Sequence, residues 1–140
     1  MAIAIIVVLV ISPIRKEIYG FPFEKSNVFF IIAFFTFIRW FLFLKTTPFN
    51  RNMIVKAMIG IGCIWLAMYS LKEFGLFQAF INDKGVESIT FHLTDDRQIA
   101  LGKYIISEFV FFGVGTIILC ILMPFKMLIS IWRTYNLNKV

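Results

Sequence analysis

The sequence has few of the residues on which catalysis and metal binding usually depend. Histidine occurs once, as His92, and cysteine twice, as Cys63 and Cys120. The chain has no HExxH pattern, no His and Cys set with zinc-ligand spacing, no GxSxG motif and no phosphate-binding P-loop. We therefore expect neither an enzyme nor a metal or cofactor site.

Charged residues are also scarce, at 16% of 140 residues, whereas hydrophobic residues make up 60% and the mean hydropathy is +0.87. A soluble domain of this size has a much more polar composition. Both cysteines lie within apolar runs, where a thiol behaves as a small hydrophobic group, and nothing indicates a disulfide framework. The composition predicts an integral membrane protein.

Four apolar segments approach the ~20 residues that a helix needs to cross a ~30 Å hydrocarbon layer. They cover residues 1–14, 28–44, 53–71 and 104–123. The first is short and has no basic start or cleavage motif of a signal peptide, so we expect a tilted helix or a locally thinned bilayer. The sequence thus predicts an all-α membrane protein with about four transmembrane helices, forming a single polytopic domain over residues 1–140.

The longest polar segment, residues 72–103, separates the third and fourth predicted spans. Its first part predicts an interfacial helix that continues the third span, with phenylalanines on one side. Ile89, Phe91 and Leu93 then alternate with polar residues ahead of a Thr-Asp-Asp-Arg turn, which predicts a small extracytoplasmic β-hairpin. Because an isolated hairpin is marginal in water, we expect these three side chains to rest on a partner or on the membrane.

Charge is divided unequally between the two sides of this predicted topology. All acidic residues fall on one side, in segment 72–103, in the link after residue 14 and, for Glu108, just inside the fourth predicted span. The other side has only basic residues, which are Arg39, Lys45, Arg51, Lys56, Lys126, Arg133 and Lys139. Because these are concentrated in a short link and the C-terminal tail, the positive-inside rule favours a cytoplasmic C-terminus, in a bacterial inner membrane. If segment 1–14 does not span, only the N-terminus changes sides.

Two ionisable residues lie inside apolar segments, where charge is costly and often functional. We expect Arg39 and Glu108 to be near opposite faces, too far apart for an ion pair. Arg39 then has three interpretations: pairing with an anionic lipid headgroup, an acid of another subunit, or a role in an ion path. Glu108 is an interfacial carboxylate, an intersubunit contact, or a proton or cation coupling residue. Lys56 is expected to be a snorkelling flank.

Small residues recur at helical spacing on two predicted spans. They are Gly60, Cys63 and Ala67 on the third, and Gly113, Thr116 and Cys120 on the fourth. Small side chains let membrane helices approach closely, so we expect these faces to pack together. The second span has phenylalanines around nearly its whole circumference, which favours a peripheral position.

The expected function is that of a non-catalytic accessory or structural subunit of a larger membrane complex. Its expected partners are larger integral membrane subunits and anionic lipid headgroups; nucleic acid is not expected, because the basic residues follow the membrane edge. The alternative is a small homo-oligomeric transporter or channel that uses Glu108. Size and span count are similar to small multidrug transporters and to membrane immunity proteins against pore-forming toxins, so toxin immunity is a third interpretation, without a matching functional residue.

Overall fold

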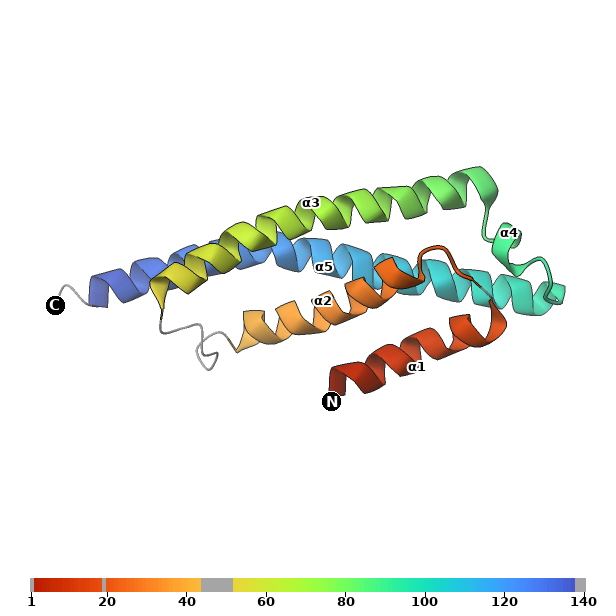
Figure 1. Ribbon diagram of the computed structural model, residues 1–140, viewed down its shortest axis with the longest axis horizontal. Coiled ribbons are helices and arrows are strands. Elements are labelled where there is room, and N and C mark those ends of the chain that lie inside the picture. The colour runs from red at the N-terminus through yellow and green to blue at the C-terminus, as the bar shows by residue number, and fades with distance from the viewer. Residues whose placement is uncertain (1, 19, 44–51, 138–140) are drawn as a thin grey trace.

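The computed structural model describes residues 2–18, 20–43 and 52–137, and this part of the chain is helical, without strands. The helices are α1 (Ala2–Glu17), α2 (Glu24–Leu42), α3 (Met53–Lys84), α4 (Glu87–Thr90) and α5 (Asp95–Leu137). Helix α5 runs along most of the molecule, with α3 antiparallel on one side and α2 on another (Figure 1). We call the two ends the α4 end and the C-terminal end.

Three of these helices, α2, α3 and α5, are long and apolar enough to cross a membrane. Helix α2 has 19 residues, about 28 Å at 1.5 Å per residue, which matches the thickness of a hydrocarbon layer. Helices α3 and α5, with 32 and 43 residues, are longer than a membrane requires. The fold is consistent with an integral membrane protein.

The prediction of a fourth span over residues 1–14 is not supported. Helix α1 has only 16 residues, about 24 Å, and it lies beside the half of α5 nearer the α4 end (Figure 1). The hydroxyl of Tyr104 donates to the backbone oxygen of Val10 at 2.8 Å. One face of α1 is buried through Ile11 and Ile14. One face of the apolar run of α1 therefore packs along the other helices.

The predicted β-hairpin is wrong. Residues 87–90 form the single turn α4, in which the Thr90 hydroxyl donates to the Val86 oxygen at 3.0 Å. Such local side-chain bonds compete with strand pairing. The predicted turn Thr94–Arg97 is instead the beginning of α5, because Asp95 and Asp96 occupy its first turn, where acidic groups favour the positive end of the helix dipole.

The helix predicted to continue the third span is present, since α3 continues without a break to Lys84. Gly85 ends it with a φ of 69°, a left-handed value that favours glycine, and its N–H donates to Ile81 O at 3.0 Å. Phe77, in this extension, is 1% exposed. Its ring stacks on that of Phe109, so packing against α5 helps to hold the last turns of α3.

The core consists of two clusters. Near the α4 end, α1, α2, α3 and α5 meet around buried Ile14, Phe30, Phe77 and Phe109. The second cluster joins α2, α3 and α5 toward the C-terminal end; its buried members are Ala33, Phe37, Cys63, Ala67, Leu119, Cys120, Met123 and Met127. Both clusters are continuous with a surface rich in exposed apolar side chains.

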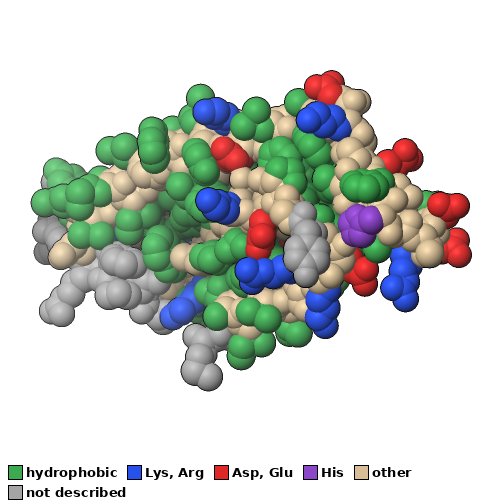
Figure 2. Space-filling view, turned by 45° about the vertical axis from the view of Figure 1, so that its right-hand side comes forward, with side chains coloured by type: hydrophobic (Ala, Val, Ile, Leu, Met, Phe, Trp, Pro, Cys, Tyr) green, Lys and Arg blue, Asp and Glu red, His purple; other side chains and the backbone are tan. Residues whose placement is uncertain are grey.

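That surface has the distribution expected of a protein in a bilayer. Charged side chains gather toward the α4 end, whereas hydrophobic side chains cover much of the remaining face (Figure 2). The exposed apolar residues of α3 include Ile54 and Trp65, and those of α5 include Phe111, Phe125 and Trp132. Contiguous apolar surface of this extent favours contact with lipid or another protein.

Candidate functional site

The most unusual polar contact in the core joins the beginning of α2 to α5. The Asn27 amide Nδ2 donates to Glu108 Oε2 at 2.7 Å. Asn27 is 0% exposed and Glu108 is 7% exposed. A carboxyl group so far removed from water needs a dense set of partners to remain charged.

The structure does not provide that set. Within the described residues, Glu108 Oε1 and Asn27 Oδ1 are buried and have no hydrogen-bond partner. A buried polar atom left without a partner costs about 1–3 kcal/mol. Each of the two groups is therefore satisfied on one side only, and this is the candidate site of the molecule.

Other polar groups surround the beginning of α2. The Ser26 hydroxyl donates to Glu73 Oε2 on α3 at 2.6 Å, and Arg15 Nε on α1 lies 3.5 Å from Glu24 Oε1. Sequence reasoning singled out Glu108 but missed Ser26 and Asn27. The signal available was the polar Glu-Lys-Ser-Asn start of an otherwise apolar segment, but nothing local indicates which of these residues faces α5.

Arg39 lies far along α2 from this site, in its last turn. Its side chain is exposed, and its guanidinium forms no hydrogen bond or ion pair with the described residues. Ile32 and Thr36 precede Arg39 on the same side of α2 at four- and three-residue spacing. Phe43 follows directly after the end of the helix, and each of these residues is exposed or half-buried. These four residues form what we call the outer face of α2, which is apolar apart from Arg39 and Thr36.

Lys56 was expected to snorkel, but its side chain is fully buried between α3 and α5. Its Nζ atom is 3.4 Å from the Thr134 hydroxyl, which itself donates to Ser130 O at 2.9 Å. An ammonium group has three donors, and this long contact satisfies one of them poorly. No carboxylate of the described chain contacts Lys56, so its burial costs stability.

We therefore expect Lys56→Met to leave the thermal midpoint of the purified protein unchanged or higher, because Met fills similar space without a buried charge. The matched control is Lys126→Met. The Lys126 ammonium donates to Phe41 O and lies 4.0 Å from the centre of the Phe41 ring, so its loss should lower the midpoint. A lower midpoint in Lys56→Met would show instead that the buried charge has a stabilising partner.

The small residues of the two predicted faces are buried. Gly60, Cys63 and Ala67 line α3 where it packs on α5, and the buried side chains of Thr116 and Cys120 lie on α5. The Thr116 hydroxyl donates to Phe30 O on α2 at 3.0 Å. The small residues of α5 thus serve contacts with α2 as well as α3, which the spacing alone does not indicate.

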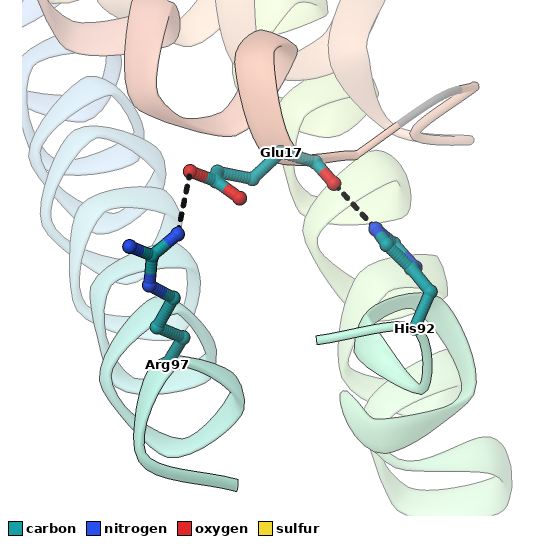
Figure 3. A network of polar contacts seen from close by, with 3 residues as sticks. All are labelled: Glu17, His92 and Arg97. Atoms are coloured by element: carbon teal, nitrogen blue, oxygen red, sulfur yellow. Dashed lines mark hydrogen bonds and ion pairs between the residues drawn. The ribbon is translucent and has the colours of Figure 1, made fainter. Parts of the chain in front are cut away.

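The three apolar residues assigned to the hairpin do not share a surface. Phe91 is 78% exposed, Ile89 packs against the first core cluster, and Leu93 lines an open groove of about 360 Å³ between α1 and α5. Nearby, His92 Nε2 donates to Glu17 O at 2.6 Å and Arg97 lies 4.0 Å from Glu17 Oε1 (Figure 3). This network holds the end of α1 against the α4–α5 connection.

Within the described ranges, no group of three or more His, Cys, Asp or Glu side chains is placed to hold a metal ion. Lys45, Arg51 and Lys139 lie outside the described residues. Comparison of the chain with protein-family models, with curated proteins and with solved structures finds no match.

Proposed function

We propose that this protein is a non-catalytic subunit of a larger integral membrane complex, in a bacterial inner membrane with its C-terminus in the cytoplasm. The observation that carries the proposal is Arg39, an exposed cation on the outer face of α2 with no acidic partner in the described chain. A membrane-embedded guanidinium pairs with a carboxylate, a backbone carbonyl or a lipid phosphate.

The distribution of charge supports a partner on another chain. Glu24, at the other end of α2, and Glu108 both belong to the α4 end, and no acidic residue lies on α2 after Glu24. A carboxylate that meets Arg39 therefore comes from outside this chain. The partner we propose is a transmembrane helix of a larger protein, with an Asp or Glu near its cytoplasmic end and an apolar stripe that packs on Ile32 and Phe43.

The arrangement of the core makes transport through one protomer a weaker hypothesis. Glu108 and Lys56 are near opposite ends of the bundle, and the second core cluster, which includes Phe37, Met123 and Met127, fills the interior between α2, α3 and α5. A proton or ion path needs polar groups or water along its length. This packing supports a structural role.

The proposal is tested by purifying a C-terminally tagged chain from its native membrane in mild detergent, with the eluate measured by native electrophoresis and mass spectrometry. We expect stoichiometric larger membrane proteins, reduced at least tenfold by Arg39→Ala, because removing one member of a desolvated charge pair costs several kcal/mol. Arg39→Lys should retain part of the partner, since it keeps the charge.

The matched control is Arg133→Ala, which removes another exposed cation near the C-terminal end, on α5. This variant should retain the partner. Recovery of a homo-oligomer alone would contradict the subunit hypothesis, and full retention of the partner in Arg39→Ala would contradict the role of Arg39 and assign it to lipid headgroups.

A further inference from the structure

We infer that Glu108 binds a proton in the folded protein and forms an acid–amide pair with Asn27. In this pair, Asn27 Nδ2 donates to Glu108 Oε2, as observed, and the protonated Oε1 of Glu108 donates to Asn27 Oδ1. The inference is independent of the proposed subunit role, because it concerns the contact of α2 with α5 inside one protomer.

The first argument is the inventory of donors and acceptors. An ionised carboxylate only accepts hydrogen bonds, and the amide oxygen of asparagine also only accepts. With Glu108 ionised, two buried acceptors, Oε1 and Oδ1, are left without a donor. A proton on Glu108 Oε1 provides a donor for Asn27 Oδ1, and the same Asn27 side chain already donates to Glu108 Oε2. A single proton can therefore satisfy both unpaired atoms at once.

The second argument is the charge of the surroundings. On α1, Arg15 is paired with Glu24 of α2 and its side chain is 77% exposed. On α3, Glu73 accepts from Ser26, the residue before Asn27, and has the same charge sign as Glu108. On α5, Tyr104 lies one turn before Glu108 and is partly exposed. Of the described residues, none forms an ion pair with the Glu108 carboxyl group, so an ionised Glu108 would have no counter-charge beside it.

The pair has a consequence for the packing of α2. Phe30 follows Asn27 on α2 and Phe109 follows Glu108 on α5. The centroids of the two rings are 5.2 Å apart. Loss of the proton would place an unpaired negative charge beside this apolar contact, where a buried charge is costly. Stability of the α2–α5 contact should therefore be greatest when Glu108 is protonated and decrease as the pH rises and the proton leaves.

The test uses the purified full chain in lipid nanodiscs. Infrared difference spectra should contain the C=O band of a protonated carboxylic acid. This band should persist when the exposed acidic residues are replaced and should be absent in Glu108→Gln. The thermal midpoint of the wild type should fall as the pH rises and Glu108 loses its proton. Glu108→Gln should lose this dependence, because glutamine also donates to Asn27 Oδ1 and accepts from Nδ2.

Glu73→Gln is the matched control, since it removes a carboxylate at the same end that is not part of the pair, and it should keep both the band and the pH dependence. If Glu108→Gln does not fold, Asn27→Leu replaces it and should shift the acid band to higher wavenumber, because the proton loses its acceptor. Absence of the band in the wild type, or an unshifted band in Asn27→Leu, would overturn the inference. Stabilisation of the wild type by sodium at constant pH, lost in Glu108→Gln, would overturn it in favour of a metal cation.

Discussion

Replacing Phe109 with alanine is expected to destabilise the packed helices by about 3 kcal/mol. The ring is fully buried and stacks on Phe77 of α3 with centroids 3.8 Å apart and an interplanar angle of 20°. It also meets Phe30 of α2 edge to face, at 5.2 Å. Phe→Ala in a soluble core costs ~3–5 kcal/mol. We expect a cost at the lower end of this range, because helices that separate in a membrane stay in lipid. They lose packing contacts but do not expose apolar surface to water.

The measurement is loss of tertiary structure during titration with a denaturing detergent, monitored by near-ultraviolet circular dichroism. Phe125→Ala is the matched control, since Phe125 is on the same helix but 61% exposed. This control should change stability by less than about 0.5 kcal/mol. Equal effects of the two substitutions would show that the aromatic cluster does not hold α2, α3 and α5 together.

Gly113→Val is expected to have the second-largest effect, and by overpacking rather than cavity formation. A Cβ at Gly113 would lie 2.8 Å from the Phe74 ring on α3 and 3.6 Å from the Phe30 ring on α2. The Phe74 ring must shift to admit this Cβ. Phe30, at ordinary contact distance on the other side, is 0% exposed, so the packing leaves little room for the two methyl groups of valine. Inserted methyl groups in a well-packed core typically cost about 1–3 kcal/mol.

A matched control is Gly62→Val on α3, because nothing lies within 4 Å of a Cβ at that position. The same detergent titration should give a clear loss of stability for Gly113→Val and a change near zero for Gly62→Val. If both variants behave alike, the close approach of the three helices at Gly113 is not important for packing. If Gly113→Val retains stability, the Phe74 ring has another place to lie.

The separation of charge is one of the features of this protein that can be predicted from its sequence. Apolar runs and the position of charged residues report where each segment can reside relative to water, so the membrane class and the helices at 28–44, 53–71 and 104–123 were predicted in outline. Small residues at helical spacing indicated a packing face on α3. In each case the signal comes from neighbours within one or two turns, and a helix makes that local pattern visible.

The features that were predicted wrongly or missed depend instead on contacts that a local pattern does not show. Alternation of Ile89, Phe91 and Leu93 fits a strand, but α4 and the early beginning of α5 depend on local hydrogen bonds and on docking against α1. The apolar run 1–14 has the composition of a span, yet its helix has only 16 residues and contacts Tyr104, 94 residues away from Val10.

By itself, the sequence indicated a largely helical membrane protein with all its acidic residues on one side, because composition and short-range periodicity decide partition from water. Only the tertiary structure decided that Asn27 meets Glu108 across 81 residues, that Lys56 is buried and that Arg39 is exposed. These outcomes depend on which helix faces meet, and the free energy that selects those faces arises from contacts between segments far apart in the chain.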